Sequence, residues 1–139
     1  MKSELARRRT VLQWLLEASE PSVRYLALRG LEGRSDDDAE VQSTQQMMTK
    51  SGWAADILSK QKAGGWWEEQ RSLYLPKYLS TNWMLLVLAD LGLTRAEPGI
   101  AKACELWVER FAKQDGGFGL DGSSKSHLCT TGNMARALV

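Results

Sequence analysis

The chain has 139 residues, a length that suits one domain with a buried core. Apolar residues make up 43% and charged residues 25%, which is ordinary for a globular protein and argues against low-complexity disorder. The formal net charge is only +1, so the overall charge gives no reason to expect nucleic acid as a partner. The locally basic start (Lys2, Arg7, Arg8 and Arg9) is interpreted as a solvated first helical turn.

The sequence carries no membrane or secretion signal. No apolar run approaches the roughly 18 residues that a membrane span requires, and no apolar core of a signal peptide follows the basic start. The two cysteines do not make a disulfide framework. We therefore expect a cytoplasmic protein with reduced thiols, without a membrane span and without a cofactor.

The N-terminal part contains short helical segments. Predicted helices cover residues 11–18, 22–31, 37–50 and 53–60, with a break at Pro21 and Ser51 as the N-cap of the last. The pattern of residues 21–31 (PSVRYLALRGL) is similar to a HEAT-type helix. We expect residues 1–50 to form HEAT-like helices within a single helical-repeat domain that covers the whole chain.

The C-terminal part predicts a helical hairpin. Residues 83–89 are apolar almost all round, which is typical of a buried helix, and Gly92 can end it in the left-handed conformation. A second helix starts at Pro98 and carries one apolar stripe, formed by Ile100, Ala103, Cys104, Trp107, Val108 and Phe111. A short connection predicts that the two helices pack side by side in opposite directions.

A further helix begins near residue 131, where the sequence soon ends. We expect the chain to supply about two and a half helical hairpins, with repeats over residues 51–139 of which the last is cut short. No stretch alternates between apolar and polar residues, so the sequence predicts an all-α fold without important β-structure.

Two segments share a pattern of glutamine, a glycine pair and an aromatic ring. Residues 61–66 read QKAGGW and residues 114–118 read QDGGF, each directly after a predicted helix. A glutamine at a helix end can bond loop backbone, glycines permit a sharp turn, and the ring can cover the helix end. The pattern therefore predicts a repeated structural clasp between neighbouring hairpins.

These segments resemble the QW motifs of squalene–hopene cyclases and oxidosqualene cyclases, which occur in relaxed form in protein prenyltransferase β-subunits. The segments PKY at 76–78, TNW at 81–83 and CTTGN at 129–133 are similar to a group of bacterial cyclase-like proteins. The resemblance covers about residues 50–139. It implies an α/α toroid, in which inner and outer helices surround a central cavity.

An acidic cluster stands outside this region. Class II terpene cyclases of the family use an acidic Asp-x-Asp-Asp motif, and residues 35–39 read SDDDA. Because carboxylates at a helix N-terminus are stabilised by the helix dipole, we interpret this cluster as a helix cap rather than a catalytic acid. We assign no catalytic residue, and lean towards a protein that is not an enzyme.

Three residues are weak candidates for zinc ligands: Cys104, His127 and Cys129, with Asp121 as an addition. Zinc needs three or four ligands, and these residues lack a recognisable spacing. Cys104 lies on the apolar stripe, which favours a buried thiol. We therefore predict no metal site.

Aromatic residues gather before and within the first helix of the C-terminal hairpin. The candidate ligand-binding set is Trp66, Trp67, Tyr74, Tyr78 and Trp83. In the cyclases that the sequence resembles, aromatic faces stabilise carbocations, but ordinary core and loop packing is the interpretation that we favour for these residues.

The sequence leaves three functions open. The first is a non-catalytic, cyclase-like helical-repeat module that binds an apolar ligand or a protein partner. The second is a fragment of a terpenoid cyclase or prenyltransferase-like enzyme that acts on isoprenoids. The third is a HEAT-like interaction scaffold. Because an open repeat array exposes an apolar end, self-association through the repeat ends is a further expectation.

Overall fold

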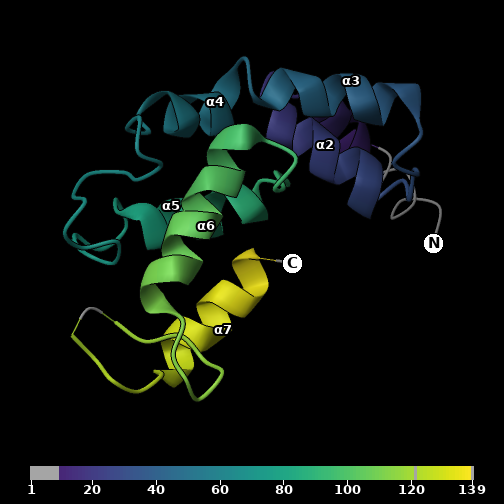
Figure 1. Ribbon diagram of the computed structural model, residues 1–139. Helices are drawn as coiled ribbons and strands as arrows, with labels where there is room; N and C mark the ends of the chain where they lie inside the picture. The colour runs from purple at the N-terminus through teal and green to yellow at the C-terminus, as the bar shows by residue number, and fades with distance from the viewer. Residues whose placement is uncertain (1–9, 121, 139) are drawn as a thin grey trace. The chain divides into compact units, whose positions relative to one another are not determined.

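The computed structural model describes residues 10–120 and 122–138, and the fold is helical (Figure 1). The helices are α2 (Pro21–Gly30), α3 (Ala39–Met48), α4 (Gly52–Ser59), α5 (Thr81–Asp90), α6 (Pro98–Phe111) and α7 (Leu128–Ala137). Residues 10–16 are helical as well. Within the described ranges the only extended pairing is an isolated bridge between Ala112 and Phe118, so the predicted all-α class is confirmed. The basic residues before Thr10 lie outside the described residues.

The chain forms two compact units, Met1–Asp56 and Ile57–Val139, with the boundary inside α4. In the first unit, α2 and α3 lie side by side (Figure 1). Its core is made by Ala27, Leu28, Val41, Met48 and Ala54. Four of these residues lie on the facing sides of α2 and α3, and Ala54 is contributed by α4.

Charged side chains add to this packing on the surface of the first unit. The Glu40 carboxylate at the start of α3 accepts hydrogen bonds from Arg24 of α2 and from Arg34. These two guanidinium groups lower the pKa of Glu40 below its usual value. The carboxylate is therefore ionised at neutral pH and ties the two helices together.

A single carboxylate serves two helix starts in this unit. Glu20 accepts a hydrogen bond from Ser22 N in the first turn of α2, at 3.3 Å, and from Trp53 N at the start of α4, at 3.0 Å. The expected N-cap of α4, Ser51, instead donates its hydroxyl to Met47 O at 3.4 Å. Ser51 thus directly precedes α4, as expected of its N-cap, but a residue distant in sequence satisfies the Trp53 N–H group.

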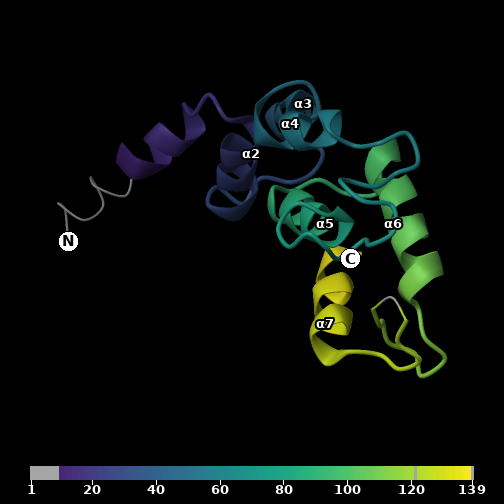
Figure 2. The ribbon, with the colours of Figure 1, turned by 90° about the vertical axis from the view of Figure 1, so that its left-hand side faces the viewer.

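In the second unit, α5 packs against both α6 and α7. Helices α6 and α7 run in opposite directions and are joined by a long loop at the lower end of Figure 2. The predicted stripe of α6 is buried at Ile100, Ala103, Cys104, Trp107 and Phe111. Val108 is the exception, since 38% of its surface is exposed.

The loop between α4 and α5 begins with a tight turn. Lys62 N donates to Trp66 O and Gly65 N donates to Lys62 O, both at 2.8 Å. Gly65 has a φ of +94°, which favours glycine. The next residue but one, Trp67, donates its backbone N–H to Thr81 Oγ1 of α5 at 3.1 Å. The turn is thus fastened to the first residue of the following helix.

The loop between α6 and α7 contains the same turn. Lys113 N donates to Gly117 O at 2.9 Å, and Gly116 N donates to Lys113 O at 3.0 Å, with a φ of +85° at Gly116. Phe118 N donates to Thr131 Oγ1 of α7 at 2.9 Å. Both loops therefore combine one backbone turn with one threonine in the helix that follows.

These hydrogen bonds align the two loops differently from the sequence motifs. They pair Gly65 with Gly116 and Trp67 with Phe118, whereas the motifs pair Trp66 with Phe118. The glutamines differ as well. Gln61 donates to Gly65 O at 3.1 Å and to Gly99 O at 2.8 Å, as expected for a clasp, while Gln114 lies exposed within the turn. The shared feature is the turn and its threonine, and not the glutamine.

Candidate functional site

Three aromatic residues meet where the first loop runs into α5. The Trp83 ring lies between Tyr74, with ring centroids 5.3 Å apart, and Tyr78, with ring centroids 5.0 Å apart. Both pairs are tilted by 51°, a geometry that aromatic pairs favour over face-to-face stacking. Trp83 Nε1 donates to Tyr74 O at 3.0 Å, which fixes the indole in the loop.

The group of rings is open to solvent on one side. Tyr78 is 70% exposed, and two neighbouring leucines, Leu75 and Leu79, are 54% and 55% exposed. We call Tyr74, Leu75, Tyr78, Leu79 and Trp83 the aromatic patch. Clustered large apolar side chains on a surface are typical of a contact site, since isolated ones are the norm elsewhere.

The Tyr78 backbone is unusual. Its φ is +68°, in the left-handed region that a bulky side chain seldom adopts. The residue stands just before Ser80, the N-cap of α5, where the chain turns into the helix. This conformation places the ring against Trp83, and such backbone strain concentrates at functional sites.

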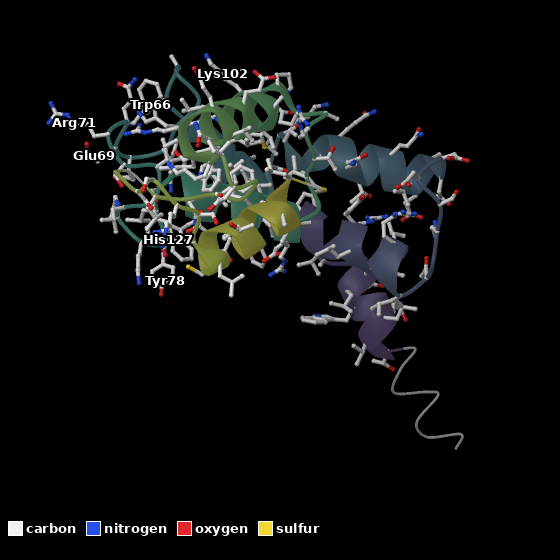
Figure 3. The ribbon with its side chains drawn as sticks, turned by 60° about the horizontal axis from the view of Figure 1, so that its bottom comes forward. Trp66, Glu69, Arg71, Tyr78, Lys102 and His127 are labelled. Carbon is white, nitrogen blue, oxygen red and sulfur yellow. The ribbon has the colours of Figure 1, made fainter. Side chains whose placement is uncertain are left out.

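The other two residues of the predicted set lie apart from the patch. Trp67 is only 2% exposed, and its Nε1 donates to Ile57 O at 2.7 Å. It is a core residue, so its prediction as a ligand contact is not supported. Trp66 is half-buried, and its ring covers Gly64, where an added Cβ would lie 1.4 Å from Cζ3. Figure 3 shows Trp66 well away from Tyr78.

The three weak zinc candidates have separate surroundings. Cys104 is buried in α6, and burial raises the pKa of its thiol. Cys129 is exposed on α7, with Sγ 3.9 Å from Thr130 Oγ1. His127 is the exposed N-cap of α7, and its Nε2 lies 3.3 Å from Ser123 Oγ (Figure 3). Among residues 10–120 and 122–138, no group of three or more His, Cys, Asp or Glu side chains could hold a metal ion; Asp121 falls outside these ranges.

The acidic cluster before α3 is engaged in capping. Asp38 accepts hydrogen bonds from Glu40 N at 2.8 Å and Val41 N at 3.2 Å, and these backbone groups lower the pKa of Asp38. Asp36 forms an ion pair with Arg29 at 3.0 Å. A carboxyl group with a lowered pKa is a poor proton donor, so this geometry favours the cap over a catalytic acid.

Sequence reasoning missed a groove on the surface of the second unit. It has a volume of about 440 Å³ and is lined by Arg95, Cys104, Glu105, Val108, Glu109 and Leu138. Val108 is the one lining residue that carried a signal in the sequence. It is an apolar member of the α6 stripe, and it is the member that the fold leaves exposed. In the first unit a more polar groove of about 350 Å³ lies beside Arg24, Thr44 and Met47.

None of the helices in the described part of the chain is both long and apolar enough to cross a membrane. No protein-family model, curated protein or solved structure matches this chain.

Proposed function

We propose that the chain is a non-catalytic helical-hairpin module, related to the α/α toroids, that binds a protein partner through the aromatic patch. The observation that carries the proposal is the exposed Tyr78 ring against Trp83, with the exposed leucines Leu75 and Leu79 in the same short loop segment. Tyrosine and tryptophan are the residues most enriched in the energetic centres of protein interfaces.

The repeat character is supported by the two loops. Each has the same backbone turn, and each fastens an aromatic residue to a threonine of the next helix. Helix α5 packs against α6, its hairpin partner, and against α7, which follows the second turn. This arrangement suits a hairpin array in which α5 and α7 occupy corresponding positions. The pairing of α2 with α3 suits the HEAT-like character that we propose for the first unit.

The patch favours a protein over a buried small ligand. Its leucines and Tyr78 are solvent-exposed, so a partner can cover them without any movement of the core. The ring of Trp83 is fixed by its hydrogen bond and by both tyrosines, which lowers the entropy lost on binding.

Selection from a random peptide-display library tests this function. The full chain is used as bait, and the Tyr78→Ser/Leu79→Ser variant removes peptides that bind elsewhere. We expect the retained peptides to be rich in apolar residues and to bind the wild-type chain at least about tenfold more tightly than the variant. A Leu31→Ser variant is the matched control, because Leu31 is also exposed but lies in the first unit.

Two outcomes would overturn the proposal. One is that no selected peptide distinguishes the wild-type chain from the Tyr78→Ser/Leu79→Ser variant. The other is conversion of squalene or a prenyl diphosphate by the purified chain, abolished by Asp37→Asn, which would establish an isoprenoid enzyme instead.

A further inference from the structure

The groove on the second unit lies apart from the aromatic patch. It is lined by residues of α6, by Leu138, which follows α7, and by Arg95, which precedes α6. Val108 is 38% exposed there, while Cys104 is buried beneath. An apolar strip bordered by charges is the usual shape of a surface that receives a helix.

In the same unit, helix α6 already lies in a site of this kind, which we call its seat. Helix α6 packs against α5, and its Gly99 lies so close to the end of α4 that an added Cβ would be 2.5 Å from Gln61 Oε1 and 3.7 Å from Leu58 Cδ2. Further along α6, Lys102 Nζ donates to Ala63 O of the first turn. Helix α6 is thus held between α5, the end of α4 and the turn that joins them.

The correspondence between the two loops predicts where a second site of this kind should lie. Because the turn at 62–66 corresponds to the turn at 113–117, α5 corresponds to α7, and the end of α4 corresponds to the end of α6. The seat that α6 fills therefore has a counterpart beside the end of α6, and the groove adjoins it, because Glu109, which corresponds to Leu58 of the first seat, lines the groove. We propose that this groove binds an amphipathic α-helix of a protein partner, in the manner in which the preceding seat holds α6.

The charges of the groove specify the helix. Glu105 and Glu109 border the α6 side, and Arg95 is the only basic group among the residues that line it. A complementary helix carries apolar residues against Val108 and Leu138, and basic residues against the two glutamates. The aromatic patch contributes no residue to this site, so the two proposals stand or fall separately.

A peptide with the sequence of residues 98–111 is the direct probe, because it is the helix that fits the corresponding seat. The peptide is labelled with a fluorophore, blocked at both ends, and titrated with the full chain while its anisotropy is followed. We expect saturable binding that Val108→Asp and Leu138→Asp each weaken about tenfold or more. Val87→Asp is the matched control and should leave binding unchanged, because Val87 of α5 is 40% exposed but does not line the groove.

The charges give a second measurement. A version of the peptide with Lys at its positions 105 and 109 should bind more tightly at low salt than the original peptide. This gain should disappear when the protein carries Glu105→Lys and Glu109→Lys. Circular dichroism verifies that each variant retains the helix content of the wild-type chain.

Three results would overturn the proposal. The first is absence of binding, and the second is equal binding by the wild-type chain and both groove variants. The third is a concentration-dependent dimer that Val108→Asp abolishes, which would assign the groove to a second copy of this chain. Peptide selection with the Tyr78→Ser/Leu79→Ser variant is unaffected by any of them.

Discussion

The loop before α5 and the loop before α7 make the same turn by different means. In the first, a buried tryptophan and a glutamine side chain hold the turn, through Trp67 and Gln61. In the second, Phe118 is half-buried, and the Asp115 carboxylate bonds Ser126 N at 3.1 Å and Ser126 Oγ at 3.0 Å. The first loop relies on burial and neutral hydrogen bonds, and the second relies on an exposed charge. One backbone geometry can thus be maintained by two unrelated sets of side chains.

The largest expected difference between the loops concerns their rings. Trp67→Ala should lower the free energy of unfolding by about 3–5 kcal/mol, because it removes a fully buried ring and leaves a large cavity. Phe118→Ala should cost about 1–2 kcal/mol, since less apolar surface is lost. Urea unfolding of both variants measures the difference, and equal losses would show that the rings are buried alike.

The second largest difference is expected between the two threonines that bond the loops, in how much stability each contributes. Thr81 is fully buried, so Thr81→Val leaves the Trp67 N–H without a partner and should cost about 1–3 kcal/mol. Thr131 is half-buried, and water can replace its hydroxyl, so Thr131→Val should cost about 0.5–1 kcal/mol. Thermal unfolding with both variants in parallel measures the two costs. A larger loss for Thr131→Val would contradict the assignment of Thr81 as the stronger fastening.

The glutamines test whether the sequence motif or the turn is the shared feature. Gln61→Ala removes two hydrogen bonds and should destabilise the chain by about 1–2 kcal/mol. Gln114 is exposed, so Gln114→Ala should stay within about 0.5 kcal/mol of the wild-type chain. Denaturant midpoints decide this, and comparable losses would restore the glutamine as the common element.

The smallest effect should depend on pH. Hydrogen bonds from Ser126 N and the Ser126 hydroxyl lower the pKa of Asp115 in the folded chain. Its contribution is therefore present above the ordinary pKa of an aspartate, about 3.9, and is lost as the pH falls through the lower folded value. The stability difference between the wild-type chain and Asp115→Asn should be present at pH 7 and shrink below about pH 4. A difference that stays constant through unfolding series at falling pH would rule out this role.

The first loop provides the control for that pH series. Its turn has Gly64 at the position that corresponds to Asp115, so no carboxylate performs the same task there. Glu69→Gln, which changes an exposed carboxylate of the first loop, should leave the pH profile unchanged.

Helix positions were predictable from the sequence because their causes are local. Pro98 starts α6 and Gly92 ends the preceding helix with a φ of +96°, as the residue types indicate. Asp38 caps α3 as expected. Helix α7 begins at Leu128, earlier than the periodicity predicted, because His127 N donates to Phe118 O at 2.8 Å and brings the chain into position.

The candidate site was predictable only in part. Tyr74, Tyr78 and Trp83 come together as a group, but Trp67 is turned inward by bonds to Ile57 O and Thr81 Oγ1. Such bonds join residues far apart in the chain and leave no periodic trace in the sequence. The exposure of Val108 has the same origin, since a helical stripe shows which residues are apolar but not where a neighbouring helix stops.

The shared carboxylate of Glu20 has a consequence for how the first unit opens. Its two hydrogen bonds, from Ser22 N and Trp53 N, join the starts of α2 and α4. Glu20 and Trp53 are 33 positions apart in the chain. Because Glu20 is the N-cap of α2, fraying at the start of α2 also moves the acceptor away from Trp53 N, so the openings that expose the Ser22 amide should expose the Trp53 amide to solvent deuterium as well.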